Sequence, residues 1–358
     1  MQTNTVVPVP TFRTLFEEAI PSRAIGALLR SCGVRRRCPP RVSATELIEG
    51  LVFHVVAKAG TLAQHVKAMT GKSITDGALS QRRALLPAAL FEQIMAAALK
   101  PKAQPAQHPA AFYHGLRLCG LDGSQFSVTN TPQVKKQMRK AKSRRGRAAF
   151  PKVGVAVMVE LGLHNPLAAA IGTGGESEMV LARRVLSAQP EKSLLIKDRY
   201  YGTPELLGMY GRRWEQELFY KELKVDMRST PLLQSHTALT AMQEVAALIL
   251  AYAVLVDYRI EAAAQGEVGV LRISFLKTMQ IVQGLWGFLE VSADLMTPEQ
   301  LRLVVRRSLR RIADMAIPKR RQRSCPRALR QPVSSWPRLR RNTYRAGSVH
   351  YSVGTIYA

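Results

Sequence analysis

Apolar residues in the first hundred positions recur at spacings of three and four, which is the period of an amphipathic helix. The pattern runs from Thr11 to Leu99 and includes FRTLFEEAI, TELIEGLVFHVVAKAGTLAQHVKAM and ALLPAALFEQIMAAALK. It predicts a helical N-terminal domain over residues 1–100. The polar, proline-bearing stretch Pro101–Pro109 then favours a linker.

The period changes after this stretch. GLRLCGLDG, SQFSVTN, FPKVGVAVMVEL and NPLAAAIGT are typical of short strands, ESEMVLARRVLSAQ of a helix, and KSLLIKD of another buried strand. Several of these strands are apolar throughout, as in a sheet covered on both faces. Residues 101–300 are therefore expected to form an α/β core.

From Thr203 to about Ala264 the pattern is helical again. Its longest apolar run, Val245–Val256, is too short to span a bilayer, which takes about 20 residues, and it predicts a buried core helix. Arginine dominates from Leu301 onward, so residues 301–358 are interpreted as a basic C-terminal tail. Such a tail serves either as an arm on DNA or as a solvated, solubilising segment.

Charge narrows the class of partner. The 358 residues hold 52 Lys and Arg against 25 Asp and Glu, a formal charge of +27. An excess of this size repels itself unless a polyanion neutralises it, so we expect nucleic acid as the partner. A membrane surface is the competing partner, but it requires an amphipathic or spanning segment, and the longest apolar run is too short to span a bilayer, so no membrane is expected. RNA is disfavoured because aromatic residues are only 6% and none interleaves the basic runs. The N-terminus has no signal-peptide pattern, which favours a cytoplasmic, nucleoid-associated protein.

The thiols and imidazoles do not show the spacing of zinc ligands. The cysteines are scattered and are interpreted as reduced thiols, and the seven histidines are dispersed and expected to have no catalytic duty. Any metal is then expected to be held by oxygen. The cysteines are Cys32, Cys38, Cys119 and Cys325.

Two aspartates follow apolar strands. Asp122 is expected to end one strand before Gly123 and Ser124, and Asp198 to end the strand LLIKD. Carboxylates at the ends of neighbouring strands can converge at the carboxyl edge of a sheet, where ligands bind. The alternative is that each aspartate caps the turn after its strand.

A four-residue stripe carries the most specific signal. Tyr210, Arg213, Glu217 and Lys224 follow at steps of three, four and seven, which on an α-helix keeps them within an arc of roughly 60°. A carboxylate flanked by cations suits phosphate chemistry. The alternative is a surface helix in which Arg213 and Glu217 form an i to i+4 ion pair. The other glutamates of this segment are expected to point elsewhere: Glu215 and Glu222.

The same four positions reproduce a signature of Tyr, two residues, Arg, three residues, Glu, six residues and Lys, with Trp214 directly after the Arg. The chain therefore resembles the DDE transposases of the bacterial insertion sequence 4 family. LDGSQFSV is similar to the strand of the first aspartate, IKDRYYGTPELL to the segment of the second, and STPLLQSHTALTAMQEVAALILAYAVL to the helical stretch after the motif. The helical N-terminal region also resembles the DNA-binding domain of that family.

The resemblance implies an RNase H-like catalytic core in which Asp122, Asp198 and Glu217 bind two Mg²⁺ or Mn²⁺ ions. These ions would serve the hydrolysis of transposon ends and the later strand transfer into target DNA. Tyr210, Arg213 and Lys224 would hold the terminal phosphates. A homodimer on double-stranded DNA, pairing two ends, is also implied.

Basic loops add candidate DNA contacts. VKKQMRKAKSRRGRAAFPK, between the two aspartates, has no acid to offset its cations and is expected to bind DNA in a salt-dependent manner. GVRRRCPPR, with Arg35, Arg36, Arg37 and Arg41, either meets phosphates or forms an exposed basic turn. The cations singled out in the first loop are Lys135, Lys136, Arg139, Lys140, Arg144 and Arg145.

One departure from the family concerns the connection to the motif helix. The family has a long β-rich insertion there, whereas only 18 residues separate Asp198 from Glu217. A helix starting at Thr203 would place Glu217 about 21 Å along its axis, so a shared metal requires a loop running back or a helix that starts after Gly208. The sequence thus leaves two main hypotheses: an active transposase, and an internally deleted, catalytically impaired remnant that only binds DNA. An RNase H-like nuclease unrelated to transposition is a weaker third hypothesis, because it does not explain the stripe of Tyr, Arg, Glu and Lys.

Overall fold

The computed structural model describes residues 12–34, 40–57, 59–138, 140, 142–143, 146–173, 175–196, 212–292 and 295–318. Its N-terminal part is helical, as predicted. Capping boxes at Ser43 and Thr61 start two of the helices, because each side chain accepts a hydrogen bond from a backbone N–H that the helix leaves free. The helices are α1 (Phe12–Ala19), α2 (Ser22–Ser31), α3 (Ala44–His54), α4 (Leu62–Thr70), α5 (Asp76–Ala84) and α6 (Ala88–Ala98).

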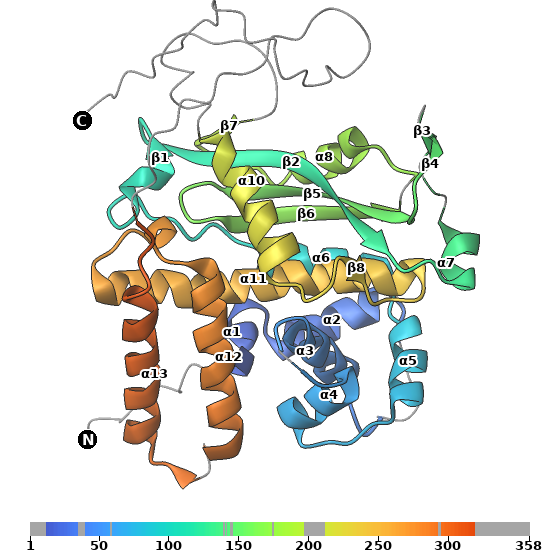
Figure 1. The fold of residues 1–358 in the computed structure, drawn as a ribbon, viewed down its shortest axis with the longest axis horizontal. Helices are drawn as coiled ribbons and strands as arrows, with labels where there is room; N and C mark the ends of the chain where they lie inside the picture. The colour runs from blue at the N-terminus through green and yellow to red at the C-terminus, as the bar shows by residue number, and fades with distance from the viewer. Residues whose placement is uncertain are drawn as a thin grey trace, which may run out of the picture.

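A mixed sheet forms the centre of the chain (Figure 1). Strands β6 (Asn165–Thr173), β5 (Lys152–Glu160) and β2 (Leu116–Val128) are antiparallel neighbours in that order. The other edge of β2 pairs in parallel with β7 (Ser193–Ile196) near its start and with β8 (Leu232–Leu233) near its end. The two-residue strand β1 (Phe112–Tyr113) pairs antiparallel with the start of β2.

The prediction that Asp122 ends a strand is wrong. GLRLCGLDG and SQFSVTN form the single strand β2, and Asp122 lies inside it opposite Val157. Pairing with β5 continues from Cys119 to Ser127, so the Gly and Ser after Asp122 are held extended by their partner strand and make no turn. The carboxylate therefore projects from the middle of a long strand.

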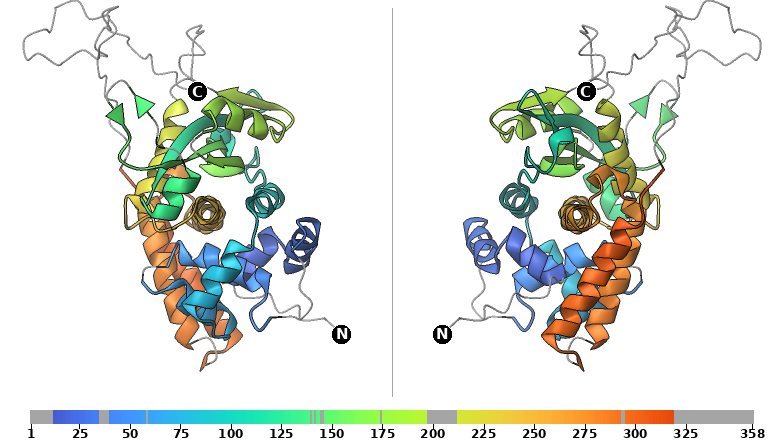
Figure 2. Two further views of the ribbon diagram at one scale, coloured as in Figure 1. Left: turned by 90° about the vertical axis from the view of Figure 1, so that its right-hand side faces the viewer. Right: turned by 90° about the vertical axis from the view of Figure 1, so that its left-hand side faces the viewer.

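Both faces of the sheet are covered, as its apolar strands predicted. Helix α8 (Glu178–Leu186) packs on one face, where Leu181 and Val185 meet Leu121 and Met158. Helix α11 (Ala238–Gly266) lies beneath the other face with α6 at its side, and both are seen end-on in Figure 2. The α1–α5 helices lie beyond them, so one apolar core joins the N-terminal helices to the sheet.

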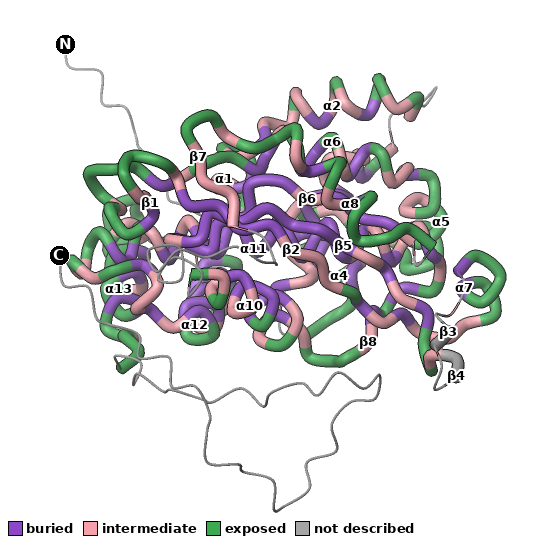
Figure 3. Tube along the Cα trace, turned by 90° about the horizontal axis from the view of Figure 1, so that it is seen from above, coloured by how far each residue is buried: buried purple, intermediate pink, exposed green. Residues whose placement is uncertain are grey.

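The long helix α11 is the buried core helix that the sequence predicted. Every residue from Val245 to Val256 is buried, and Figure 3 shows the helix running through the middle of the molecule. By length and composition α11 could also cross a membrane, but 72% of its apolar window is buried inside the fold. A core helix is the simpler explanation of its apolar sequence.

The region assigned to the basic tail begins as packed structure. Helix α12 (Phe275–Ser292) is followed by α13 (Pro298–Ala313), whose Val305, Leu309 and Ile312 are buried. Residues 301–313 therefore belong to an amphipathic helix and do not form a flexible arm. The apolar residues of this helix face the core. Residues 319–358 of the predicted tail lie outside the described residues.

Smaller elements complete the described part. The segment predicted as a linker contains no regular element before η1 (Pro109–Ala111), and its Lys102 and Ala103 N–H groups each donate to buried Glu160 at 3.0 Å. The basic loop after β2 holds α7 (Pro132–Gln137) and the short strands β3 (Lys142–Ser143) and β4 (Gly146–Arg147). A 3₁₀ turn, η3 (Val270–Arg272), joins α11 to α12.

Candidate active site

The motif helix crosses β2 at Asp122. It consists of α10 (Arg213–Lys221) and the π-helical turn η2 (Glu222–Asp226), and Figure 1 shows it lying across the sheet. Four helical residues advance about 6 Å and two strand residues nearly 7 Å, so every fourth helix residue can meet every second strand residue. The pairs that meet are Gln216 with Gly120, Tyr220 with Asp122, and Lys224 with Ser124.

These three contacts fix the helix closely. The Tyr220 hydroxyl donates to the backbone oxygen of Asp122 at 2.6 Å, and Lys224 Nζ donates to Ser124 Oγ at 3.2 Å. A Cβ added to Gly120 would lie 2.6 Å from Gln216 Oε1, so the glycine lets the end of this side chain pack close to β2. Burial, and then the charge of Asp122, raise the pKa of Tyr220, so its hydroxyl stays protonated and able to donate.

Two of the three predicted catalytic carboxylates are described. Asp122 is half-buried, and its Oδ1 accepts from the N–H of Gly123 at 2.8 Å. The Glu217 side chain is 39% exposed and forms the i to i+4 ion pair with Arg213 at 2.8 Å. Asp198 and Tyr210 lie outside the described residues.

The metal site of the resemblance is only partly described. Within the described ranges, no three His, Cys, Asp or Glu side chains form a group that could hold a metal ion. Asp122 and Glu217 do offer carboxylate oxygens, the ligands that Mg²⁺ and Mn²⁺ prefer. The donor chemistry of these two carboxylates thus fits these ions.

The π-helical turn changes the predicted stripe. The Met227 N–H donates to the Glu222 carbonyl at 3.0 Å, across five residues, so the ideal arc of roughly 60° does not extend past Glu222. Arg213 and Glu217 remain neighbours on α10, while Lys224 is turned towards Ser124 on β2. Single π-helical turns are frequent at functional sites.

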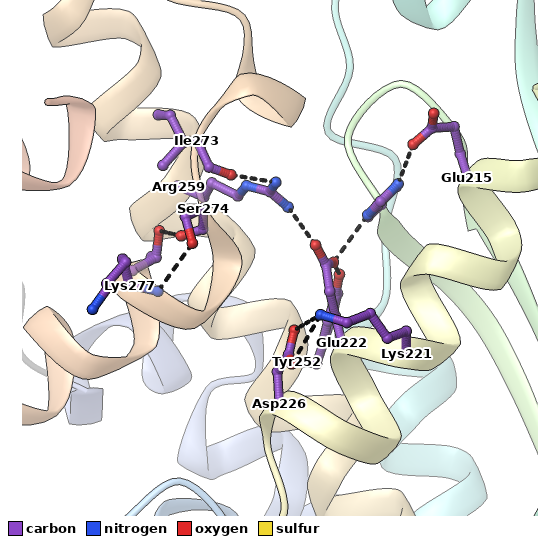
Figure 4. A network of polar contacts seen from close by, with 11 residues as sticks. Glu215, Lys221, Glu222, Asp226, Tyr252, Arg259, Ile273, Ser274 and Lys277 are labelled. Carbon is purple, nitrogen blue, oxygen red and sulfur yellow. Dashed lines mark hydrogen bonds and ion pairs between the residues drawn. The ribbon is translucent and has the colours of Figure 1, made fainter. Parts of the chain in front are cut away.

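A buried polar network anchors the opposite side of the motif helix (Figure 4). His164, in the turn between β5 and β6, lies 2.9 Å from both Glu222 and Glu215. The Tyr252 hydroxyl of α11 donates to Glu222 at 2.5 Å, and Arg259 approaches the same carboxylate at 3.5 Å. The motif helix is thus tied to both the sheet and α11.

Each charged group in this network stabilises the ionised form of its partner. Burial alone would raise the pKa of Glu222, but His164 and Arg259 lower it to about 2. Burial alone would lower the pKa of His164, but the charge of Glu222 and the hydrogen bond that His164 donates to Glu215 raise it. A buried ion pair of this kind is held by complementary charge, and removing one partner strands the other.

Sequence reasoning placed Glu215 and Glu222 away from the stripe, which is correct, but did not give them a partner. The two glutamates are seven residues apart, which puts both on one face of a helix. This spacing alone could have predicted a basic residue packed against that face. His164 could not be identified in this way because it comes from a turn 51 residues before Glu215 in the chain. It is a core histidine, as expected for most of the seven.

The predicted basic contacts are partly described. Lys135 and Lys136 are exposed on α7, and Lys140 is half-buried beyond it. The α7 helix itself is docked, because its Val134 is buried and Gln137 Oε1 accepts from the Ala238 N–H at 2.9 Å. Arg41 is exposed. The remaining cations lie outside the described residues: Arg35, Arg36, Arg37, Arg139, Arg144 and Arg145.

The thiols agree with the interpretation as reduced cysteines where they are described. Cys32 and Cys119 are free, and burial raises the pKa of Cys119 to about 12, which makes it unreactive. Cys38 and Cys325 lie outside the described residues.

Comparison with known proteins gives one informative similarity. No family model matches the chain, and no solved structure matches it at a significant level. An Escherichia coli (strain K12) protein described as "Putative transposase InsZ" is 30% identical over 96 residues, which are 26% of this chain. The chain covers only 32% of the length of that relative. Over about a quarter of its length, the chain is therefore similar to a transposase.

Proposed function

We propose that the chain is an insertion-sequence transposase that binds transposon ends and catalyses metal-dependent DNA cleavage and strand transfer. The observation that carries this proposal is the docking of the motif helix across β2, with Tyr220 bonded to the backbone of Asp122. The helix with Glu217 and the strand with Asp122 are thereby held against each other. Similarity to a transposase agrees with this assignment.

The sheet supports an RNase H-like core with Asp198 as the third carboxylate. Ile196, the last described residue of β7, pairs in parallel with Gly120, two residues before Asp122. Asp198 comes two residues after Ile196 in the sequence. In this proposal the register of β7 on β2 continues for two more residues, so that Asp198 would lie beside Asp122.

The position of the motif helix on the sheet bears on whether the short connection between Asp198 and Glu217 prevents a shared metal site. The described part of the motif helix runs from Arg213 to Lys221 and includes Glu217. Gln216, its neighbour, packs on Gly120, the same residue that pairs with the end of β7. The short connection therefore does not keep Glu217 far from the strand ends, which favours the active enzyme over the impaired remnant.

Each residue then has a distinct role. Asp122, Asp198 and Glu217 would hold two Mg²⁺ or Mn²⁺ ions, which supply activation of the attacking hydroxyl and stabilisation of the leaving oxygen. Lys224 and Arg213 would hold phosphates of the DNA end, with Tyr210 beside them. Tyr220 and Gln216 position the helix on the sheet.

Cleavage of a labelled duplex carrying the element's own terminal repeat tests this function. The wild type should cleave in Mg²⁺ and in Mn²⁺, and the variants Asp122→Ala and Glu217→Ala should not. Retained, salt-sensitive binding without cleavage by the wild type would instead identify a DNA-binding remnant. Binding lost together with cleavage would reject both hypotheses.

A further inference from the structure

Two cations share one aromatic ring beside the proposed active site. Phe126 lies on β2 four residues beyond Asp122 and is fully buried. Lys224 Nζ lies 5.8 Å from the centre of its ring and the Arg228 guanidinium carbon 5.4 Å. Contacts of this length are cation–π interactions, which hold both charges close to one ring.

Neither cation has a carboxylate partner among the described residues. Lys224 donates to the neutral Ser124 hydroxyl, and Arg228 Nη2 is shielded from solvent without any hydrogen-bond partner. The acid that acts on Arg228, Glu244, is already engaged by the backbone N–H groups of Gln234 and Ser235 and by the Ser235 hydroxyl. The fold thus leaves the positive charge of this half-buried guanidinium without a neutralising carboxylate among the described residues.

The local field reinforces the need for an anion. Burial lowers the pKa of Lys224, and the charges of Arg228 and Lys152 lower it further. Burial likewise lowers the pKa of Arg228. Like charges held together in this way repel one another until a negative group enters between them.

We propose that Arg228, together with Lys224 and supported by Phe126, forms a binding site for a phosphate of the DNA backbone. Its guanidinium presents paired N–H donors that match two phosphate oxygens, whereas Lys224 supplies a point charge. Arg228 lies four residues beyond the Lys of the signature, so the phosphate contacts extend past the motif along β2. The identity of the ligand as DNA rests on the proposed function.

Salt-dependent DNA binding by the full chain tests this site. The probe is a fluorescent duplex of arbitrary sequence, titrated by anisotropy between about 50 and 200 mM KCl. Arg228→Gln should weaken binding about 3- to 10-fold and reduce the slope of log K against log salt by about one. Arg228→Lys should retain most of the slope because it keeps the charge.

A matched control comes from the other face of the sheet. Arg183 is exposed on α8, so Arg183→Gln removes the same charge from a region away from the motif helix. It should leave affinity within about two-fold of the wild type. An unchanged slope for Arg228→Gln, or an equal loss for Arg183→Gln, would overturn the site.

Labelling of the wild type avoids dependence on the folding of the variants. Phenylglyoxal modification of arginines, read by peptide mass spectrometry, is compared without ligand, with the duplex and with sodium sulfate. Protection of Arg228 but not Arg183 by the duplex supports the site as proposed. Protection by sulfate alone, in a chain that does not bind DNA, would keep the anion site and reject the proposed function. Protection by neither would overturn the proposal.

Discussion

Two glutamates on the same helix have opposite surroundings. Glu222 is buried among His164, Tyr252 and Arg259, whereas Glu217 is 39% exposed and pairs only with Arg213 within the described chain. The first carboxylate is fully committed to internal partners, and the second remains accessible to metal or DNA. Rich hydrogen bonding thus identifies the anchor of the motif helix, whereas the exposure of Glu217 suits the catalytic role proposed for it.

The largest expected effect separates the two carboxylates by activity. Glu217→Gln should reduce DNA cleavage by about 1000-fold or more, since an amide is a poor ligand for a divalent ion and bears no charge. The free energy of unfolding should change by less than about 0.5 kcal/mol, because an exposed i to i+4 pair contributes little. Cleavage assays and urea unfolding measure the two quantities.

Glu299→Gln is the matched control for this change. Glu299 is an exposed helical carboxylate that pairs with Arg302 at 3.6 Å, on α13 and away from β2. It should leave cleavage unchanged. A comparable loss of activity in both variants would show that general surface charge, and not the position of Glu217, is responsible.

Removing the anchor should have the opposite outcome. Glu222→Gln leaves the buried charge of Arg259 without its carboxylate and His164 with Glu215 alone, and breaking a buried pair destabilises a fold by about 3–5 kcal/mol. Urea unfolding should show this loss directly. A stability equal to that of Glu217→Gln would contradict the assignment of Glu222 as an anchor.

Much of the fold could be predicted because it follows local pattern. The N-terminal helices, β5, β6, α8 and the apolar run in α11 each have a clear period of their own. The continuity of β2 could not be predicted, because Gly123 and Ser124 read locally as a turn and only pairing with β5 holds them extended. Helix α13 was likewise not predicted, because its many arginines dominate the sequence pattern and its buried apolar residues are few.

The residues of the candidate site also differ in whether local sequence pattern could predict them. Arg213, Glu217 and Lys224 were found from spacing along one helix, which is a local property. His164 and Arg228 were missed because their roles depend on residues brought near by folding, Glu222 in one case and Phe126 in the other. The π-helical turn at Glu222 also cannot be read from a helical period.

Acid should weaken the anchor in a defined window. The pKa of Glu222 is about 2 in the folded chain, below its ordinary value of 4.5. Its contribution to stability is therefore present above about pH 4.5 and is lost as the pH falls through 2. The stability difference between the wild type and Glu222→Gln, measured by urea unfolding, should shrink across this range. A constant difference would mean that Glu222 does not carry the charge assigned to it.

The smallest expected effect concerns the contact between helix and strand. Tyr220→Phe removes one hydrogen bond to the Asp122 backbone and should destabilise the chain by about 1 kcal/mol. Cleavage should fall by only a few-fold, because Gln216 still bonds to Val157 on β5 and Lys224 to Ser124 on β2. Thermal unfolding and single-turnover cleavage provide the two measurements, and full activity with unchanged stability would show that the contact positions nothing.

The most direct test of the central claim is a crystal structure of the full chain grown with Mn²⁺, analysed by anomalous diffraction. The account predicts anomalous density within about 2.3 Å of carboxylate oxygens from Asp122, Asp198 and Glu217, with Glu217 released from Arg213. Density at none of these residues, with Asp198 remote from Asp122, would contradict a shared catalytic site and leave a chain that binds DNA without cutting it.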